Sequence, residues 1–335
     1  MKITIKDIAK MANVSVATVS KVINKKDDDI SDSTKERIMD IVKKENYIPN
    51  IMARSLITKK TNTIGLIIPD ISNPFFPELA RGVEDKANDF GYNVIICNTD
   101  NDNEKEKNYL NMLSEKMVDG VILTEGSNSI EKQDIAVNCT FPLVLVDRDM
   151  DSPLVKGKIM VNDFMGSYMI TEHLIKKNHK NIIFAGGPQA IKSTKNRFNG
   201  YTMALKENSI NVEKHKVFFG DYKVEFGYKM VQELINTHIN FSAIVCGNDL
   251  IAIGAIKALK ESGYKIPEDV AVSGFDDIYL AQFIEPTLTT VVQPSYEMGA
   301  SAAEVLIRAI NLKNSGAEDI EVKEINTVLK VRESS

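Results

Sequence analysis

The sequence predicts an α/β protein in which a small helical head precedes a larger body of alternating strands and helices. Residues 4–44 carry apolar side chains at helical spacing. From Thr63 onward, short apolar runs alternate with amphipathic stretches, a pattern typical of doubly wound parallel sheets with helices on both faces. At 335 residues the chain exceeds one ordinary domain, which agrees with a head and a separate body.

The head begins with two short amphipathic helices around a tight turn within residues 4–24. Thr4 precedes the first helix as an N-cap, and Asp7 three residues later completes a capping box. Asn13 and Val14 form the turn, and Ser15 caps the second helix. The apolar positions predicted to face inward are Ile5, Ile8, Ala9, Ala12, Val19, Val22 and Ile23.

A third helix follows, and the three helices together leave one face free. The third helix begins at Ser31, or at Ser33 with Glu36 as a capping box, and it buries Ile38, Ile41 and Val42. Small and polar side chains remain on the outside of the second helix, where they suit insertion into a DNA groove: Val16, Ala17, Ser20 and Lys21. This arrangement is typical of a helix-turn-helix DNA-binding unit, although any small helical bundle shares the amphipathic spacing.

The segment after the head contains a very short helix and a polar linker. Pro49 ends the head, because the residue before a proline avoids helical backbone. Asn50 caps a predicted helix from Ile51 to Leu56, and residues 59–62 form the linker. A helix this short is marginal in isolation, so we expect it to form only when something, such as DNA or a partner subunit, holds it.

In the body, βα alternation predicts two similar subdomains, with a break near Val161. The predicted strands are 64–69, 93–97, 120–123, 143–147, 181–185, 216–220, 243–246, 270–274 and 288–292. The predicted helices are 75–90, 104–117, 163–178, 194–208, 225–237, 249–262 and 295–312.

Charge and cysteine content narrow the class of protein. The net charge is −5, but residues 1–60 hold 13 lysines and arginines against 8 acids, so the head is basic (+5) and the remainder is acidic (−10). A basic head on an acidic body favours phosphate binding by the head alone.

The three cysteines, Cys97, Cys139 and Cys246, are isolated and odd in number, as expected of reduced thiols in the cytoplasm. The N-terminal residues lack the apolar core of a signal peptide, and no apolar run spans a membrane. The four histidines show no metal-ligand spacing, so we expect no metal and no cofactor.

Seven motifs, in order along almost the whole chain, resemble those of the lactose-repressor (LacI) family of transcription regulators. They are TIKDIAKMANVSVATVSKVIN, NYIPN, ARSL, IGLIIPDISNPFF, DGVIL, VSGFDD and PTLTTVVQP. The resemblance implies a body similar to the sugar-binding proteins of bacterial periplasms, in which two αβ subdomains joined by three crossovers close around a ligand. It also implies dimerisation through the body.

The resemblance places the domain boundaries as follows. Residues 1–49 form the helix-turn-helix domain, and 50–61 form the hinge helix and linker. Residues 62–335 form the effector-binding and dimerisation domain. Its N-subdomain is expected at about 62–161 plus 292–320, and its C-subdomain at about 162–291 plus 321–333.

The resemblance also implies which residues contact DNA. Those expected to bind it are Ser15, Val16, Ala17, Thr18, Ser20, Lys21, Asn24, Tyr47, Asn50, Ala53, Arg54 and Leu56. Lys21 replaces an arginine common at its position, and an ammonium cannot form the bidentate contact with guanine. Asp27, Asp28 and Asp29 form an acidic run beside this face, interpreted as a solvated loop that weakens nonspecific affinity.

Residues 53–56 resemble the family's hinge helix, which enters the minor groove at the centre of the operator. Leu56 then corresponds to the apolar wedge that opens a base step and kinks the duplex. Without the resemblance, packing of Leu56 against its own chain is the simpler interpretation.

Polar and aromatic residues gather at the carboxyl ends of the predicted strands, where parallel sheets bind ligands. The candidate effector-binding residues are Asn73, Phe75, Phe76, Asp147, Arg148, Arg197, Tyr222, Asn248, Asp276 and Gln293. Taken singly, some of these residues could serve the fold alone: Asn248 could cap a helix, Asp147 could pair with Arg148, and Phe75 could be core.

The candidate set suits a neutral sugar. Carboxylates accept hydroxyl hydrogens, Arg and Asn donate to oxygens, and aromatic rings stack on apolar C–H faces. Position by position the set is similar to that of ribose-binding proteins, so ribose or a related pentose or hexose is the first hypothesis. The two arginines leave a sugar acid or a sugar phosphate as alternatives.

The sequence thus predicts a ligand-controlled repressor that is a dimer on a pseudo-palindromic operator. The sequence ends at Ser335 soon after the strand-like EVKEINTVLKV, without a heptad leucine tail, so we expect a dimer rather than a coiled-coil tetramer. A global carbon-catabolite regulator with a phosphorylated carrier protein is the alternative, although Glu304 stands where that subfamily carries an arginine suited to phosphoserine.

An enzyme is disfavoured, because the chain has neither G-x-G-x-x-G after the first strand nor a Walker lysine motif. The head and the missing signal peptide disfavour a periplasmic transport receptor.

Overall fold

The computed structural model describes residues 3–47, 60–124, 126, 139–312 and 320–335. The chain forms two compact units that divide between Thr61 and Asn62. Among the described helices, none is both long and apolar enough to cross a membrane.

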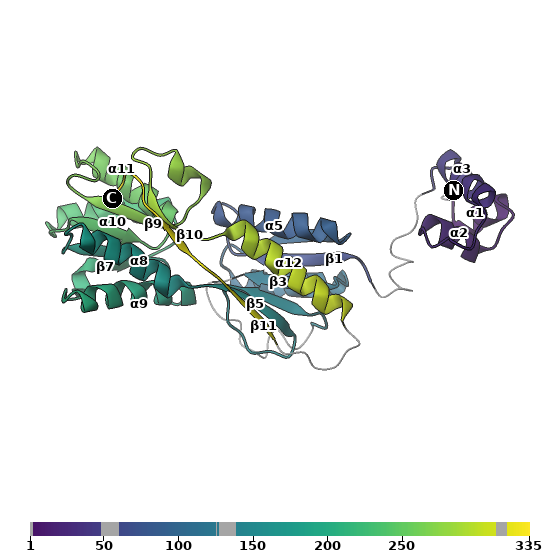
Figure 1. The fold of residues 1–335 in the computed structure, drawn as a ribbon, viewed down its shortest axis with the longest axis horizontal. Helices are drawn as coiled ribbons and strands as arrows, with labels where there is room; N and C mark the ends of the chain where they lie inside the picture. Colours follow the sequence, from purple (N-terminus) through teal and green to yellow (C-terminus); the bar gives the residue numbers. More distant parts are fainter. Residues whose placement is uncertain (1–2, 48–59, 125, 127–138, 313–319) are drawn as a thin grey trace. The chain divides into compact units, whose positions relative to one another are not determined.

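The first unit is a three-helix head: α1 (Ile5–Met11), α2 (Val16–Ile23) and α3 (Asp32–Lys44) (Figure 1). Its core consists of Ile8, Ala9, Ala12, Val19, Val22 and Ile38. The predicted capping box is present, since Asp7 N donates to Thr4 Oγ1 and Thr4 N donates to Asp7 Oδ2. Ser15 Oγ accepts a hydrogen bond from Thr18 N over 3.0 Å and starts α2.

The third helix departs from two expectations. It follows Ser31, whose hydroxyl contacts the hydroxyls of Ser33 and Thr34 instead of capping a backbone N–H, so the capping box of Ser33 and Glu36 is wrong. Ile41 and Val42 are only half-buried, because two helices can cover just one stripe of a third.

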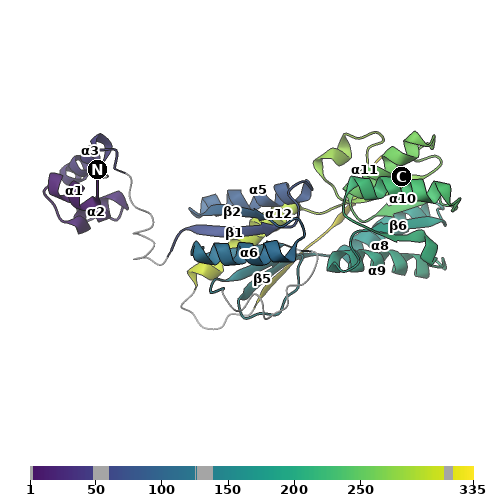
Figure 2. The same cartoon turned by 180° about the vertical axis from the view of Figure 1, so that it is seen from behind.

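The second unit contains two six-stranded sheets (Figures 1 and 2). The first has the order β11-β5-β4-β3-β1-β2, and all its pairings are parallel. Its strands are β1 (Thr63–Ile68), β2 (Asn93–Asn98), β3 (Gly120–Thr124), β4 (Leu143–Val146), β5 (Val155–Val161) and β11 (Glu321–Ile325). Its helices are α5 (Phe75–Asp89) and α12 (Ser295–Asn311) on one face and α6 (Asn103–Glu115) on the other.

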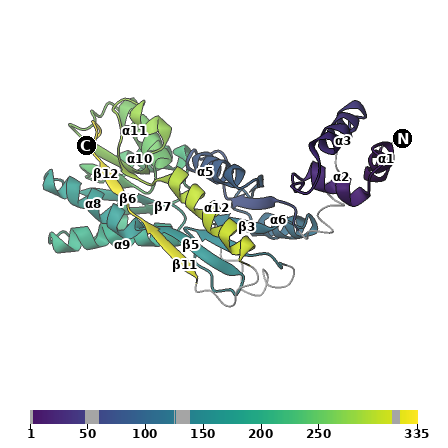
Figure 3. The same cartoon turned by 45° about the vertical axis from the view of Figure 1, so that its right-hand side comes forward.

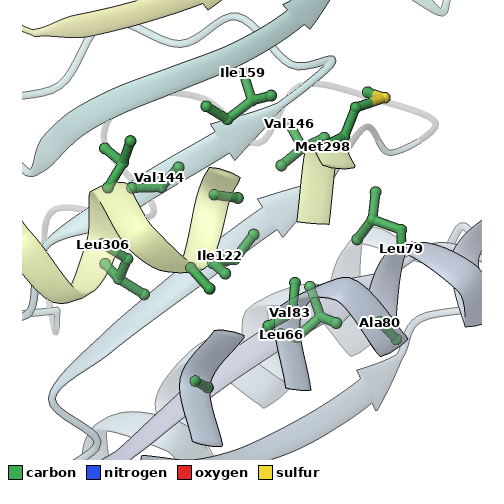
Figure 4. Close-up of a cluster of buried hydrophobic side chains, with 14 of the residues drawn as sticks. Leu66, Leu79, Ala80, Val83, Ile122, Val144, Val146, Ile159, Met298 and Leu306 are labelled. Atoms are coloured by element: carbon green, nitrogen blue, oxygen red, sulfur yellow. The ribbon is translucent and has the colours of Figure 1, made fainter. Parts of the chain in front are cut away.

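The layer between α5, α12 and the first sheet is a continuous apolar core (Figure 4). Strand residues contributing to it include Leu66, Ile122, Val144, Val146 and Ile159, while Leu79, Val83, Met298 and Leu306 come from the helices. The two helices approach closely because each has a glycine at the contact. A Cβ at Gly82 would lie 2.1 Å from Tyr296 O, and one at Gly299 would lie 2.0 Å from Leu79 O.

The second sheet has the order β12-β10-β9-β8-β6-β7, parallel except for the pairing of β10 with β12. Its strands are β6 (Ile182–Gly186), β7 (Val217–Phe219), β8 (Ala243–Cys246), β9 (Ala271–Asp276), β10 (Thr289–Val292) and β12 (Val328–Lys330). Helices α8 (Asp163–Lys176) and α9 (Lys192–Glu207) cover one face, and α10 (Val224–Asn236) and α11 (Asp249–Glu261) cover the other. Short 3-10 helices lie at η1 (Lys214–Lys216) and η2 (Tyr279–Gln282).

Three chain segments connect the two sheets: β5 to α8, β10 to α12, and β11 to β12 (Figure 3). The predicted α/β class with two doubly wound subdomains and three crossovers is therefore confirmed.

Two strands differ from the sequence-based expectation. The sequence does not predict strand β5, because Lys156, Gly157 and Lys158 interrupt its apolar pattern, yet every second residue of it is buried. Strand β11 pairs in parallel with β5 in the first sheet, so the assignment of residues 321–325 to the C-subdomain is wrong. Only Ile325 of this edge strand is buried, which leaves no alternating pattern to show where it pairs.

Candidate functional site

The head presents one face of α2 to solvent. Val16, Ala17 and Lys21 are exposed, whereas Thr18 and Ser20 are half-buried. Asn24 Nδ2 donates to Ser20 O over 2.7 Å and closes the end of the helix. The face therefore offers a short, mostly small-residue surface that suits the floor of a major groove.

Other predicted DNA-contacting residues are placed differently. Tyr47 is half-buried and packs against the head core, and burial raises the pKa of its hydroxyl. Ser15 is exposed, but it also has a structural role as the N-cap of α2. The predicted hinge residues lie outside the described residues: Asn50, Ala53, Arg54 and Leu56.

The body contains a cavity of about 330 Å³, and its lining includes residues at the carboxyl ends of strands from both sheets. This volume is at the lower end of the range for small-molecule sites. Nine of the ten predicted effector residues line it: Asn73, Phe75, Phe76, Asp147, Arg197, Tyr222, Asn248, Asp276 and Gln293.

Arg148 is the exception. Its guanidinium lies 2.8 Å from Glu106 Oε1 and donates to Thr124 O over 3.4 Å. Both members of this ion pair are buried, and Arg148 is not among the residues that line the cavity. The backbone of the preceding residue, Asp147, adopts a positive φ of 50°.

Arg197 is the buried cation of the cavity, and the chain itself neutralises it. Its Nε donates to Asp163 Oδ1 over 2.7 Å, and its Nη1 donates to Gly247 O over 2.6 Å. Asp276 Oδ1 lies 3.8 Å from Nη1, and the guanidinium carbon lies 3.8 Å from the centre of the Phe275 ring. Burial opposes the charge, but the carboxylates of Asp163 and Asp276 raise the pKa of Arg197.

Asp276 is the last residue of β9, and Gln293 Nε2 donates to its Oδ1 over 2.7 Å. Its φ is 112°, a strained conformation for a side-chain-bearing residue that often marks a functional position. Burial raises the pKa of Asp276 to about 6, although Arg197 and Gln293 oppose the shift. Two carboxylates, Asp163 and Asp276, thus share one guanidinium.

Two buried polar atoms at the cavity have no hydrogen-bond partner among the described residues. They are Nδ2 of Asn248 and Oε1 of Gln293. Asn248 Oδ1 accepts from Ile251 N over 2.9 Å, so this residue caps α11 and still retains its amide donor. An unpaired buried donor and acceptor cost free energy unless a ligand pairs with them.

Three aromatic residues also line the cavity: Phe75, Phe76 and Tyr222. Phe75 and Phe76 meet edge to face with ring centroids 5.1 Å apart. The Tyr222 hydroxyl lies 2.7 Å from Thr194 Oγ1. Asn73 Oδ1 accepts from Phe75 N over 3.2 Å and so orders the start of α5.

Sequence reasoning missed several cavity residues. Those with polar side chains are Asp70, Asp100, Asn101, Thr124, Ser193, Asp221 and Lys223. Asp70, Asp100 and Asp221 follow β1, β2 and β7, so a uniform search at strand ends would have found them. Asp163, which holds Arg197, starts α8 and carries no such signal. The described residues hold no cluster of three or more potential metal-ligating side chains.

Each of the two units matches a known protein family. Residues 4–50 match the family described as bacterial regulatory proteins, lacI family. Residues 61–333 match the family described as periplasmic binding proteins and sugar binding domain of LacI family.

Individual relatives agree with these matches. The transcriptional regulator RegA of Clostridium saccharobutylicum is 42% identical over 93% of this chain and 94% of its own. The ribose operon repressor of Halalkalibacterium halodurans is 40% identical over 99% of this chain and 97% of its own. A LacI family regulator from Enterococcus faecium, solved with bound ribose, superposes with a TM-score of 0.72 at 26% identity, covering 82% of this chain and 98% of that one. The chain therefore belongs to the lacI family of bacterial regulatory proteins, which are DNA-binding transcription regulators and not enzymes.

Proposed function

We propose that the chain represses transcription from a pseudo-palindromic operator and that a neutral sugar in the body cavity controls its DNA affinity. Ribose, or a related pentose or hexose, is the proposed effector. The observation that carries this proposal is the charge of the cavity lining. Among the described residues, the lining contains five aspartates (Asp70, Asp100, Asp147, Asp221 and Asp276) but only Arg197 and Lys223 as cations.

An acidic lining favours an uncharged polyol over a sugar acid or a sugar phosphate. Arg197 is already paired with Asp163, and Arg148 is paired with Glu106 away from the cavity. Neither arginine is therefore available to an anion without breaking a buried ion pair, which is costly. Carboxylates such as Asp276 and Asp147 are suited to accept hydrogens from sugar hydroxyls.

The two unpaired atoms add a geometric requirement. A ligand needs an acceptor for Asn248 Nδ2 and a donor for Gln293 Oε1. A hydroxyl group can be either, so adjacent hydroxyls of a pentose satisfy both. The names of two relatives, a ribose operon repressor and a ribose-bound regulator, support ribose as the first candidate.

Control of DNA binding follows from linkage. A sugar that closes the subdomains and binds this closed form better weakens operator binding by the coupling free energy, typically about 1–3 kcal/mol. We propose that the hinge segment at residues 50–61 transmits the change, with Leu56 as the minor-groove wedge. The proposed DNA contacts also include the N-cap Ser15 and, on the recognition helix, Val16, Ala17, Ser20 and Lys21, with Thr18, Asn24 and Tyr47 nearer phosphates.

The chain is proposed to be a cytoplasmic homodimer. In the C-subdomain, Tyr279 and Phe283 are 68% and 63% exposed with ring centroids 4.7 Å apart, and Leu280 beside them is also exposed. A second copy that covers these side chains would remove apolar surface from water and place two heads on two half-sites.

The alternative of a phosphorylated carrier protein is less favoured by the surface of α12. Glu304 lies 3.7 Å from Lys86 Nζ and 3.2 Å from Arg308 Nη2. Arg308 also lies 2.9 Å from Glu321. The nearby cations are therefore already paired with carboxylates, which a phosphoserine would have to displace.

Thermal-shift measurements on the full-length chain test the effector. Ribose, xylose, glucose, gluconate and ribose 5-phosphate would be compared at equal concentrations. A ligand at 100 times its Kd stabilises the folded state by about 2.7 kcal/mol, so ribose should raise Tm clearly. A shift from gluconate or ribose 5-phosphate, with none from any neutral sugar, would contradict the proposal.

The hinge is tested separately by Leu56→Ala. This variant should bind the selected operator more weakly and bend it less, as measured by gel mobility of circularly permuted fragments. Unchanged affinity and bending would show that Leu56 is not the wedge.

A further inference from the structure

An ion pair joins the loop between α2 and α3 to the recognition helix, α2. Lys21 Nζ donates to Asp29 Oδ2 over 2.5 Å. Lys21 is on the exposed face of α2, and Asp29 is eight residues later in the loop. The hydrogen bond from Ile30 N to Asp27 O and the positive φ of Lys25 (53°) shape this loop.

The pair neutralises the one charged side chain that α2 itself contributes to its exposed face. The side chains of Lys21 and Asp29 remain 49% and 65% exposed, so DNA can reach the ammonium from outside. The hydrogen bond from Lys21 also lowers the pKa of the Asp29 carboxyl, which keeps it ionised. A phosphate or a base edge must therefore compete with a carboxylate that is already bound.

We propose that Asp29 is a positioning residue that holds Lys21 away from DNA, so that Lys21 binds only DNA whose acceptors outcompete the Asp29 carboxylate. The inference rests on the DNA-binding function and deepens it. It assigns a role to the acidic run, of which Asp29 is the member that contacts the recognition helix.

The expected effect is small but measurable. Exposed ion pairs contribute about 0.2–1 kcal/mol, which corresponds to a ~1.4- to 5-fold change in affinity. Random-sequence DNA offers Lys21 chiefly phosphates, and each additional phosphate contact steepens the dependence of log K on log salt by about 0.9. Releasing Lys21 should thus strengthen nonspecific binding and increase its salt dependence.

Asp28→Asn is the matched control. Asp28 lies next to Asp29, is exposed, and forms no ion pair with a described residue. Both substitutions remove one negative charge from the same loop, but only Asp29→Asn frees Lys21.

The experiment measures binding of the full-length chain to a mixed-sequence duplex and to the tightest duplex selected from a random pool, over a salt series. Asp29→Asn should tighten binding to the mixed duplex ~1.4- to 5-fold more than Asp28→Asn does, with a steeper salt slope. Adding Lys21→Met should abolish that extra gain, and Asp29→Glu should retain wild-type affinity and slope. The ratio of selected to mixed-duplex affinity should fall in Asp29→Asn.

Three results would overturn the inference. Asp28→Asn and Asp29→Asn could have equal effects, which would indicate general electrostatics. The gain could persist with Lys21→Met, or Asp29→Asn could weaken binding. Failure of the wild-type chain to bind either duplex would instead contradict the DNA-binding function itself.

Discussion

Replacing Asp276 with asparagine should stabilise the effector-free chain while weakening its response to sugar. Asp276 is buried beside Arg197, and burial raises the pKa of its carboxyl to about 6 from an ordinary value near 3.8. Asp163, 2.7 Å from Arg197 Nε, already supplies one carboxylate to that guanidinium. Asparagine retains an oxygen that can accept the hydrogen bond from Gln293, but it carries no charge.

The magnitude and its pH dependence follow from linkage. Below pH 3.8, Asp276 is protonated in both the folded and unfolded states, and its ionisation costs nothing. Between pH 3.8 and about 6, the unfolded state releases the proton while the folded state keeps it, so wild-type stability falls as the pH rises. At about 1.4 kcal/mol per pKa unit, the shift of about two units amounts to about 3 kcal/mol at pH 7, as an upper estimate.

Thermal unfolding of both proteins from pH 4 to pH 7 measures this difference. The stabilisation by Asp276→Asn should be near zero at pH 4 and should grow toward pH 7, to at most about 3 kcal/mol, or at most roughly 6 °C in Tm. Asp277→Asn is the matched control at the next residue. Asp277 pairs with Arg332 over 2.5 Å and with Lys330 over 3.2 Å, so its neutralisation should lower Tm.

Destabilisation of the chain by Asp276→Asn at pH 7, as expected of Asp277→Asn, would contradict this prediction. That result would show that Arg197 needs the Asp276 charge in the folded state. A gain in stability that is the same at pH 4 and pH 7 would also contradict it, because it could not arise from ionisation.

Three further predictions concern the cavity and the proposed dimer. Asn248→Ser keeps a hydroxyl oxygen that can cap α11 but removes the unpaired amide donor Nδ2, so ribose affinity should fall by about 1–3 kcal/mol in calorimetry with little change in Tm. Lys192→Met removes the 3.0 Å pair with Asp149 that joins α9 to the first subdomain, and it should weaken ribose binding ~1.4- to 5-fold. Lys195→Met, an exposed change on the same helix, should have no effect. Phe283→Lys should shift the chain toward monomers in sedimentation velocity and weaken operator binding, whereas Met203→Lys should not; an intact Phe283→Lys dimer would exclude this surface.

Elements with strong local signals could be predicted from the sequence. The capping box of Thr4 and Asp7 and the cap at Ser15 depend on residues three apart, and both are present. The apolar runs of β1, β3 and β4 are buried on both faces, so each remains a strand wherever it pairs. Strand β11 lacked such a signal, because four of its five residues are exposed and its parallel partner β5 is distant in the sequence.

The sequence by itself determined the class of the fold, the helix-turn-helix head and the group of residues at the carboxyl ends of the strands, because these features depend on periodicity and on the rule that parallel strands end together. Only the tertiary structure decided how those residues pair. From the sequence, Arg148 and Arg197 were equally good candidates for the cavity. In the structure, Arg148 pairs with Glu106 away from the cavity, whereas Arg197 lies between Asp163 and Asp276 inside it. Charge pairing depends on distances between segments that are far apart in sequence, and no local pattern encodes them. The same holds for Lys21 and Asp29, where a short loop determines which charge of the head is available to DNA.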